Sequence, residues 1–448
     1  MIFDIKALKI ILENALIQHD IPGLEIAIDY EDQNIFSLGL GTSNLINECT
    51  IKPDTIFGVA SLTKMLTTLI VLKAEELRLI TLSDSLSDYY PNLRLINKNS
   101  INIRNLLNHS AGLPGLPTRH KATDLNFPSI NPQMESVASL IEYLNTLDFE
   151  LLDKPGLLLS YSNEGYCLLG GIIEQIFDKP YALVAEELVF KPLKMQNSFI
   201  GRDKNGVAQN IADPIVSWHQ GERASSTEYW DAPLFYPAGG LMSSAKDINK
   251  LISALSGSSD FLKSDQYEQV TFDPMSVASR HELKFAYGLG IEIEYINSQK
   301  TLLWHTGQRP GISSFAGQVI QDRISVTLLT NVADAPTSSI GRLIFSQLLC
   351  QKDKTINLNW PPTTNNPTIE EKDLKDFTGI YGSPEVGQYK VYLKGEKILM
   401  QFMNSKKEMF FKDKNNGTVG VQTFDFIFKN NSKPYALALD LRILLRLI

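Results

Sequence analysis

The stretch Phe57-Gly-Val-Ala-Ser61-Leu-Thr-Lys64-Met-Leu-Thr-Thr-Leu-Ile70 places a serine and a lysine three residues apart, where an apolar helix is expected to begin. Residues three apart on a helix share a face, so the Ser61 hydroxyl and the Lys64 amine can come within hydrogen-bonding reach. A serine becomes a good nucleophile when a neighbouring base takes its proton, and burial can lower the pKa of a lysine enough for this task. The helix start adds backbone N–H donors beside the reacting oxygen. The stretch therefore predicts a nucleophile, Ser61, with Lys64 beside it.

The Ser-x-x-Lys pattern is weak by itself, because it occurs a second time at Ser243-Ser-Ala-Lys246. There Ser244 and Asp247 form the Ser-x-x-Asp pattern that starts many helices, so we interpret the second copy as a helix cap. The assignment of Ser61 therefore depends on partner residues further along the chain.

Length and composition limit the classes of protein to consider. With 448 residues, 43% of them hydrophobic, the chain is expected to form two globular domains. A formal net charge of −8 indicates neither nucleic acid nor an anionic membrane as a partner. Cys49, Cys167 and Cys350 are too few and too scattered for a disulfide framework or a metal cluster. The sequence shows no membrane span and no secretory signal pattern, so we expect a cytoplasmic protein.

Hydrophobic periodicity predicts an α+β order of elements up to about residue 350. The predicted helices lie at 5–16, from 61 onward, at 86–90, 103–107 and 166–177, and after Ser244. The predicted strands lie at 24–28, 35–40, 287–294, 301–304, 312–320 and 324–330, and the later ones are expected to form an antiparallel group. The irregular, proline-containing segment 115–135 is expected to be a pocket wall or lid.

A second pair of polar side chains, Tyr161 and Asn163, precedes one of the predicted helices. Pro155-Gly156 leads into this segment, and in extended backbone a spacing of two points both side chains the same way. A tyrosine can relay a proton, and an asparagine amide can hold a carbonyl oxygen or an amine. The same Tyr-x-Asn pattern occurs without this context at three other places, 90–92, 143–145 and 295–297.

A third candidate segment, His305-Thr-Gly307-Gln308, follows the strand predicted at 301–304. Glycine in a strand beside polar residues indicates that another part of the chain or a ligand approaches the backbone there. His219 begins a second His-x-Gly pattern, but no strand flanks it. Because an isolated histidine is more often structural than catalytic, we assign structural roles to His109 and His219.

With these three segments in order, the chain resembles the serine β-lactamase and penicillin-binding-protein superfamily, in its class C-like branch. The family motifs are matched by Ser61-Leu-Thr-Lys64, Tyr161-Ser-Asn163 and His305-Thr-Gly307. Further segments that match the family lie at 106–114, 238–241 and 328–331. The resemblance covers about residues 5 to 350 and implies a β-lactamase/transpeptidase-like α+β fold, an antiparallel sheet flanked by helices with a helical subdomain.

The third motif departs from the Lys-Thr-Gly of β-lactamases and many transpeptidases, because it begins with His305. The His-x-Gly version resembles D-aminopeptidases, related D-amino-acid peptidases and some carboxylesterases of the same branch. A lysine there would help to bind a substrate carboxylate, whereas a histidine gives a weaker and pH-dependent charge. Whether Arg309 substitutes for that lysine depends on where its side chain points.

The resemblance implies a serine hydrolase that works through an acyl-enzyme, without metal or cofactor. Ser61 would attack a carbonyl, and Lys64 and Tyr161 would transfer protons, although the sequence leaves open which of the two is the initial base. The backbone N–H groups of Ser61 and Gln308 would form the oxyanion hole. The implied substrate-binding residues are Asn163, His305, Gly307 and Gln308.

The expected substrate is a small amide or ester, so the chain would be a peptidase, with D-amino-acid specificity as one option, or a carboxylesterase. One alternative is a β-lactamase or DD-carboxypeptidase, which the missing Lys-Thr-Gly and the missing signal make less favourable. Another is a penicillin-binding sensor or scaffold that acylates without turnover. The sequence does not determine the oligomeric state, and a homo-oligomer is compatible with it.

The composition changes near the C-terminus. Residues 353–367 are polar and proline-rich, and we expect a linker there between a hydrolase domain, 1–352, and a small β domain, 368–448. Short alternating runs at 377–381, 390–394, 398–403, 409–412, 419–421, 424–428 and 435–439 predict an antiparallel sheet or barrel. The Phe377-Thr-Gly-Ile-Tyr381 opening resembles the lipocalin-like domain attached to many class C-like hydrolases. We expect this domain to be structural or dimerising, so that residues 1–352 alone keep the reactive serine.

Overall fold

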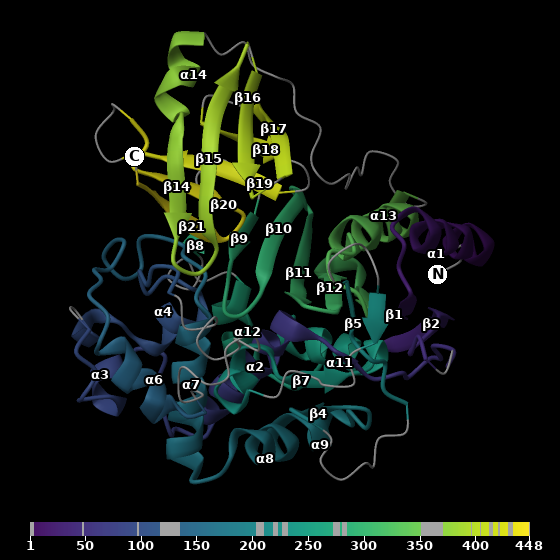
Figure 1. Cartoon of the computed structure of the whole chain (residues 1–448). Helices are drawn as coiled ribbons and strands as arrows, with labels where there is room; N and C mark the ends of the chain where they lie inside the picture. The colour runs from purple at the N-terminus through teal and green to yellow at the C-terminus, as the bar shows by residue number, and fades with distance from the viewer. Residues whose placement is uncertain are drawn as a thin grey trace.

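The computed structural model of the chain shows a large body of helices and strands and a smaller C-terminal β-barrel (Figure 1). The structure describes residues 4–46, 49–95, 98–116, 135–202, 210–217, 223–225, 232–271, 278–279, 285–350, 371–395, 397–403, 405–411, 415–419, 422–428 and 433–447. Most of the lid predicted over 115–135, the whole linker predicted over 353–367, and His219 lie outside these residues, so the domain boundaries stay predictions. Within the described ranges, no helix combines the length and the apolar character needed to cross a bilayer.

The body is built on one eight-stranded antiparallel sheet with the strand order β2-β1-β13-β12-β11-β10-β9-β8. Its strands are β1 (Gly23–Tyr30), β2 (Gln33–Gly41), β8 (Ala278–Ser279), β9 (Phe285–Tyr287), β10 (Glu292–Asn297), β11 (Lys300–Arg309), β12 (Ile312–Val319) and β13 (Ile324–Thr330). Pairing of β1 with β13 joins the N-terminal hairpin to strands from the far end of the body, with Leu24 opposite Thr330. The antiparallel sheet expected from the sequence is confirmed.

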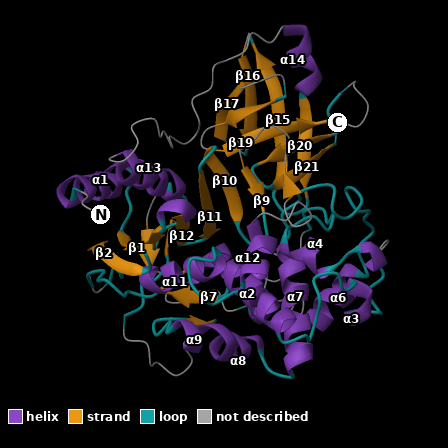
Figure 2. Cartoon of the chain, turned by 180° about the vertical axis from the view of Figure 1, so that it is seen from behind, coloured by secondary structure: helices purple, strands orange, loops and turns teal. Residues whose placement is uncertain are grey.

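Helices cover both faces of this sheet (Figures 1 and 2). The helices of the body are α1 (Ile5–Gln18), α2 (Thr63–Glu76), α3 (Leu86–Tyr89), α4 (Ile103–Leu107), α6 (Val137–Leu144), α7 (Asn163–Phe177), α8 (Tyr181–Ala185), α9 (Lys191–Leu193), α10 (Tyr236–Gly239), α11 (Ala245–Leu255), α12 (Ser264–Thr271) and α13 (Thr337–Cys350). On one face, Leu12 of α1 and Phe345 of α13 share an apolar core with Ile26 of β1. On the other face, Ala27 of β1 joins the core of α2 and α11, because successive side chains of a strand point to opposite faces.

The helices α3, α4, α6 and α7 form the helical subdomain beside the sheet, and their apolar side chains continue the core of α2 (Figure 2). Two small antiparallel sheets complete the body. In one, β3 (Phe57–Gly58) and β4 (Phe199–Ile200) both pair with β7 (Leu241–Ser243). In the other, β5 (Ile215–Ser217) pairs with β6 (Arg223–Ser225). The strand β3 ends three residues before Ser61. The reactive serine is therefore expected at the junction of the sheet side and the helical layer.

The C-terminal part is a closed antiparallel barrel of eight strands, β14 to β21, with α14 (Glu371–Phe377) at its start (Figure 1). The strands are β14 (Gly379–Ser383), β15 (Gly387–Lys394), β16 (Lys397–Phe402), β17 (Ser405–Phe411), β18 (Asn416–Val419), β19 (Gln422–Ile427), β20 (Ala436–Leu439) and β21 (Arg442–Arg446). Aromatic side chains fill its interior, for example Phe377 stacked on Phe426 with ring centres 4.5 Å apart. The small β domain expected from the sequence is confirmed as a barrel.

The predicted elements differ from the structure in several details. The strand predicted over 301–304 extends to Arg309 as β11, so His305 and Gly307 lie within it. The strand predicted over 287–294 is two strands, β9 and β10, because Gly288 and Gly290 form a tight turn between them and Gly290 has φ of 71°. The helix α7 begins at Asn163 instead of Tyr166, since the Ser162 hydroxyl caps it. The strand β21 has no counterpart among the predicted strands.

Candidate active site

Ser61 lies in a 3₁₀ turn, Ala60–Leu62, between the end of β3 and the start of α2 at Thr63. Ala60 has φ of 48°, in the left-handed region that non-glycine residues rarely occupy. The Thr63 hydroxyl donates to the Ala60 carbonyl at 2.6 Å and helps to hold this turn. Ser61 is half-buried, whereas its neighbours in the turn are buried. The turn therefore presents the Ser61 hydroxyl at the N-terminal end of α2, as the sequence predicts.

The Lys64 amine is fully buried and lies 3.3 Å from the Oγ of Ser61. It also donates to the Oδ1 of Asn163 at 2.9 Å and to the backbone oxygen of Ala238 at 2.8 Å. Burial lowers the pKa of Lys64 to about 7, because the charged form loses its hydration. A neutral amine has two hydrogens and one lone pair, so the two oxygen acceptors take the hydrogens and the lone pair is left for Ser61. This arrangement suits Lys64 to accept the proton of Ser61.

Tyr161 and Asn163 reach the same place from the start of α7. Ser162 between them is extended, with φ of −135° and ψ of 124°, as the spacing of two requires. The ring centre of Tyr161 lies 4.8 Å from the Nζ of Lys64, and the Ser61 side chain is close enough to its hydroxyl to favour the ionised phenol slightly. Burial raises the pKa of Tyr161 well above its usual range, so the phenol keeps its proton at neutral pH. The structure thus brings together Ser61, Lys64, Tyr161 and Asn163.

His305 lies on β11 with both ring nitrogens hydrogen-bonded to the protein. Its Nδ1 is 2.6 Å from the backbone oxygen of Thr306, which can only accept, so Nδ1 carries the proton. Its Nε2 therefore accepts from the Tyr287 hydroxyl at 2.8 Å. Burial and the nearby Lys64 amine lower the pKa of His305 to about 3. The ring is neutral at physiological pH and supplies no charge for a substrate carboxylate.

Gly307 lies where β11 passes the turn that carries Ser61. A Cβ at this position would lie 2.2 Å from the backbone oxygen of Val59 and 3.0 Å from the backbone nitrogen of Ser61. The Ser314 hydroxyl, on the neighbouring strand, donates to the same Val59 oxygen at 2.8 Å. The close backbone approach that the sequence predicts for this glycine is made by the chain itself.

The side chains of the next two residues of β11, Gln308 and Arg309, are both hydrogen-bonded to other parts of the chain. Gln308 is exposed and donates from Nε2 to the Asp334 carboxylate at 2.5 Å, so only its backbone can serve the site. Arg309 donates to the backbone oxygen of Gly239 at 3.3 Å, next to the Ala238 carbonyl that binds Lys64. Arg309 therefore lies at the rim of the site.

Three aromatic residues, His109, Tyr166 and Tyr287, pack together beside Tyr161. The ring centre of His109 lies 4.1 Å from that of Tyr161, 5.2 Å from that of Tyr166 and 4.8 Å from that of Tyr287. The Nδ1 of His109 accepts from the Ser162 N–H at 3.1 Å, which is consistent with the structural role assigned from the sequence. Tyr166 and Tyr287 are not predicted from the sequence, because no spacing rule connects them to the motifs.

The C-terminal barrel also reaches the site, through the hairpin formed by β20 and β21. The backbone N–H of Tyr161 donates to the carbonyl of Leu441 at 3.0 Å. The guanidinium carbon of Arg442 lies 5.0 Å from the ring centre of Tyr161, and the guanidinium donates to Glu385 at 2.8 Å. No motif marks these barrel residues, and β21 is missing from the predicted strands, so the sequence does not reveal them.

The second Ser-x-x-Lys copy does not form a comparable site. Ser243 is buried and lies 2.8 Å from the Ser198 hydroxyl, while Lys246 forms an ion pair with Asp54 at 3.0 Å. Ser244 caps α11, as predicted.

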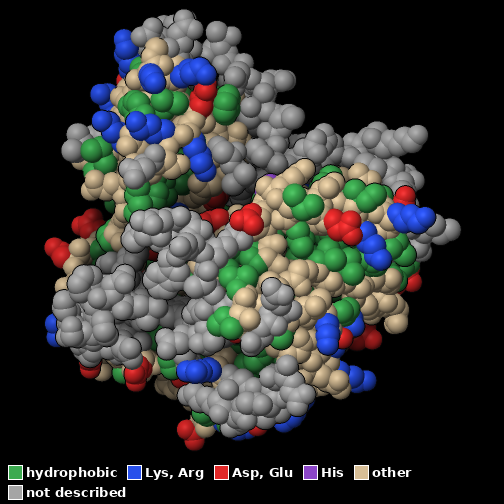
Figure 3. Space-filling view, turned by 45° about the vertical axis from the view of Figure 1, so that its right-hand side comes forward, with side chains coloured by type: hydrophobic (Ala, Val, Ile, Leu, Met, Phe, Trp, Pro, Cys, Tyr) green, Lys and Arg blue, Asp and Glu red, His purple; other side chains and the backbone are tan. Residues whose placement is uncertain are grey.

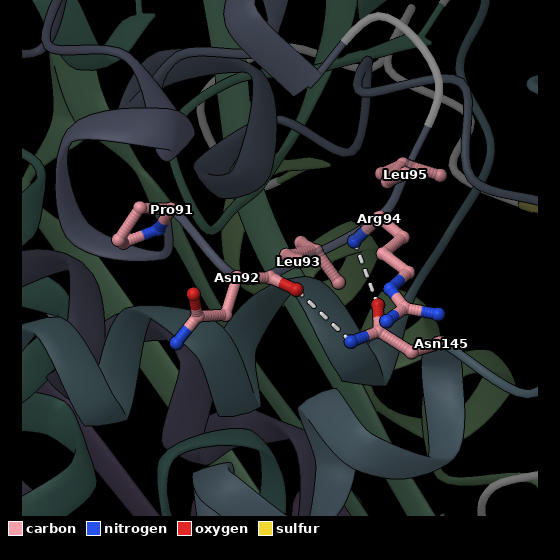
Figure 4. A pocket seen from close by; sticks show the side chains of 6 residues that line it. All are labelled: Pro91, Asn92, Leu93, Arg94, Leu95 and Asn145. Carbon is pink, nitrogen blue, oxygen red and sulfur yellow. Dashed lines mark hydrogen bonds between the residues drawn. The ribbon is translucent and has the colours of Figure 1, made fainter.

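An open hollow of about 600 Å³ lies on the helical layer, lined by residues 91–95 and Asn145 (Figure 4). The Asn145 amide donates to the Asn92 carbonyl at 3.0 Å and accepts from the Arg94 N–H at 2.6 Å. The Asn145 side chain therefore holds the backbone of the loop formed by residues 91–95. None of the motif residues lines this hollow. In the described ranges, no group of three or more His, Cys, Asp or Glu side chains is arranged to hold a metal ion.

A profile of the Beta-lactamase family matches residues 8–349. The chain belongs to the beta-lactamase family. The three motifs that begin at Ser61, Tyr161 and His305 all lie within the matched residues.

One curated relative is Protein flp of Staphylococcus aureus (strain MW2), which is 25% identical over 333 residues, covering 72% of this chain and 62% of the relative. The chain thus spans less than two thirds of that relative's length. Among solved structures, the octameric penicillin-binding protein homologue from Pyrococcus abyssi has a TM-score of 0.69 at 21% identity and covers 99% of this chain and 100% of that chain. A D-amino acid amidase from Ochrobactrum anthropi SV3, complexed with L-phenylalanine, has a TM-score of 0.63 at 20% identity and covers 77% of this chain and 96% of that chain. At these identities the structures show the shared fold.

Proposed function

We propose that the chain hydrolyses a small amide or ester through an acyl-enzyme formed on Ser61. Lys64 takes the Ser61 proton while the Oγ bonds to the substrate carbonyl carbon and the carbonyl oxygen becomes an oxyanion. The proton then passes from Lys64, through the Tyr161 hydroxyl, to the leaving amine or alcohol as its bond to the carbonyl carbon breaks. Water then takes the place of the leaving group. Its proton passes through Tyr161 to Lys64, and Lys64 returns a proton to the Ser61 Oγ as the acyl bond breaks. The observation that carries the proposal is the buried Lys64 amine, 3.3 Å from Ser61 with its hydrogens held by two oxygen acceptors.

The pKa values support Lys64 instead of Tyr161 as the initial base. Burial lowers the pKa of Lys64 to about 7 and raises that of Tyr161 well above its usual range. At pH 7 and above, a large fraction of Lys64 is therefore neutral, while Tyr161 keeps the proton that it must pass on.

The remaining roles follow from the positions around Ser61. Asn163 holds Lys64 and would orient the substrate carbonyl with its amide N–H groups. The backbone N–H groups of Ser61 and Gln308 would form the oxyanion hole. This assignment is supported by the close approach of β11 to the Ser61 backbone at Gly307.

The neutral His305 favours a peptidase or carboxylesterase over a β-lactamase or DD-carboxypeptidase. The substrates of the latter enzymes carry a carboxylate, and His305 offers that carboxylate no positive charge, since its pKa is lowered to about 3. A D-amino acid amidase shares the fold, so amides of D-amino acids are included in the proposed substrate class.

A fluorophosphonate probe tests the nucleophile, since it labels activated serines. We expect a single labelled site at Ser61, and no labelling or turnover in Ser61→Ala. Ser243→Ala is the matched control, because Ser243 occupies the same motif without a lysine partner, and it should label like the wild type. Labelling that persists in Ser61→Ala would contradict the proposal.

A substrate panel tests the class. We expect turnover of uncharged p-nitrophenyl esters or of D- or L-aminoacyl anilides, and poor turnover of a cephalosporin. Efficient cephalosporin hydrolysis would favour the β-lactamase alternative. A burst of one equivalent without sustained turnover on every substrate would favour the sensor or scaffold alternative.

Self-association, which the octameric Pyrococcus protein makes worth testing, can be measured by light scattering on the same sample.

A further inference from the structure

The hairpin between β20 and β21 brings the barrel into contact with the segment that carries Tyr161. The Leu441 carbonyl accepts the Tyr161 backbone N–H at 3.0 Å, and the Leu441 side chain packs against an apolar cluster that contains Leu159, Tyr161 and Tyr287. The guanidinium of Arg442 lies 5.0 Å from the Tyr161 ring centre. The barrel, which the sequence predicts to be structural or dimerising, therefore borders the proton-transfer pair.

This contact places two charged groups beside the site. Arg442 donates to Glu385, in the turn between β14 and β15, at 2.8 Å. The Glu385 side chain keeps 7% of its surface exposed and that of Arg442 keeps 30%, so solvent screens both charges only in part. The Lys64 Nζ and the Arg442 guanidinium both lie within 5.0 Å of the same Tyr161 ring centre, so they are at most about 10 Å apart.

We propose that Arg442 and Glu385 are positioning residues of the hydrolytic reaction, which act through Lys64: the guanidinium favours the neutral, basic form of the Lys64 amine, and the carboxylate limits this effect. The proposal rests on the assignment of Ser61, Lys64 and Tyr161 made above. It gives the barrel an electrostatic part in the chemistry of a site whose motifs all lie in the other domain.

The physical reason is the repulsion between like charges in a site with little water. Arg442 lowers the pKa of Lys64, and Glu385 raises it. The same two groups act on Tyr161 in the same directions, so removing Arg442 makes both groups harder to deprotonate. Two cations separated by this distance interact strongly enough to shift a pKa by about 0.5 to 1 unit.

Other titratable groups also face the Lys64 amine, but most of them are neutral. Those that surround it are Tyr161, Tyr166, Cys167, Glu164, His109 and His305. Burial raises the pKa values of the two tyrosines and of the Cys167 thiol and lowers those of the two histidines, so these five carry no charge near pH 7. Glu164 belongs to α7 and is the same in all the variants considered below, so Arg442 and Glu385 are the charges that the barrel adds.

The test measures the rate of fluorophosphonate labelling of Ser61 as a function of pH in the full-length protein. The rate should rise with pH as Lys64 loses its proton. Arg442→Met should move the midpoint of this rise up by about 0.5 to 1 pH unit, and Glu385→Gln should move it down by a similar amount. Arg442→Lys keeps the charge and should leave the midpoint close to that of the wild type. In the double variant, Arg442→Met with Glu385→Gln, the two shifts should largely cancel.

The two single substitutions are expected to move the midpoint in opposite directions, and this distinguishes the proposal from a purely structural role. Both single substitutions break the same ion pair, so a purely structural pair would lower the rate at every pH in both variants without moving the midpoint. That result, or shifts in the same direction, would overturn the proposal. A wild type that is not labelled at all would instead contradict the proposed function. Melting temperatures identify any variant that fails to fold, and the charge-conserving and double variants then still decide the outcome.

Discussion

The Nζ of Lys64 and the Oδ1 of Asn163 form a hydrogen bond of 2.9 Å that joins the first turn of α2 to the first residue of α7. Asn163 is an amide, so it takes a hydrogen from the amine without adding a charge that would hold a proton on it. Together with the Ala238 carbonyl, it leaves the lone pair of a neutral Lys64 directed to Ser61. The hydrogen bond therefore holds the proposed base in position, while burial lowers the pKa of the Lys64 amine.

The rate at which Ser61 is labelled should rise with pH near neutrality. The reaction needs neutral Lys64, whose pKa is lowered to about 7, so the rate falls as pH drops through that value and reaches a plateau above it. Lys64→Arg keeps a permanent cation and should lower the plateau by about 10² to 10⁴-fold. A plot of labelling rate between pH 5 and 9 checks both statements, and a flat wild-type profile would contradict them.

Asn163→Asp should move the midpoint of this rise in labelling rate to higher pH by more than one unit. The substitution keeps the shape of the side chain but places a negative charge 2.9 Å from the Lys64 amine, and an opposite charge stabilises the protonated form. Asn249→Asp, a buried asparagine of α11 that bonds Asp29 and Thr327, is a control for the general cost of a buried carboxylate. An unchanged midpoint in Asn163→Asp would mean that this residue does not contact the base.

Gly307→Ala should abolish Ser61 labelling or lower it by at least about 100-fold. The added Cβ would lie 2.2 Å from the Val59 oxygen, so the turn that carries Ser61 or the strand β11 must shift, and small displacements of reacting groups are costly. The control is Gly165→Ala in α7, where the added Cβ would meet its nearest atom, in Leu106, at 3.6 Å. Equal labelling rates in the two variants would show that the close approach at Gly307 is not needed.

Tyr287→Phe should lower stability more than it lowers labelling. The change leaves the buried Nε2 of His305 without its donor, which costs about 1 to 3 kcal/mol in the free energy of unfolding. Because His305 is neutral and lies beside the proton-transfer pair instead of within it, the labelling rate should fall by less than about tenfold. The measurements are urea unfolding and labelling, with Tyr295→Phe, a tyrosine whose side chain is 45% exposed, as the control. A loss of labelling with unchanged stability would give His305 a direct part in the reaction.

Leu441→Ala should slow the labelling of Ser61 although Leu441 lies far away in the sequence. The side chain packs on the cluster of Tyr161 and Tyr287, so its loss should loosen the proton-transfer tyrosine and cost about 1 to 2 kcal/mol in stability. Leu445→Ala, an exposed leucine of the adjoining strand β21, is the matched control and should change neither quantity. If residues 1–352 alone were labelled as fast as the full chain, the contribution of the barrel would be ruled out.

Several features could be predicted from the sequence because they depend on near neighbours. The spacing of Ser61 and Lys64 places them on one face of a helix start wherever that helix packs. The segments 312–320 and 324–330 predict strands of an antiparallel group, and both strands are buried along their length in the structure. Gly307 marks a close backbone approach, because a glycine in a strand interior otherwise weakens it. The family motifs then connect these local features to one fold.

The tertiary structure alone decided which groups meet across the chain and how deeply they are buried. The pKa of Lys64 near 7, the neutral state of His305 and the protonated state of Tyr161 all result from desolvation, which depends on packing by distant segments. The contact of Arg442 with the Tyr161 ring joins the C-terminal barrel to the body that carries the motifs, and no local periodicity in β21 indicates it. Local spacing determines which side chains share a face of an element, but the solvent, charges and hydrogen-bond partners of a side chain are set by whatever packs against that face.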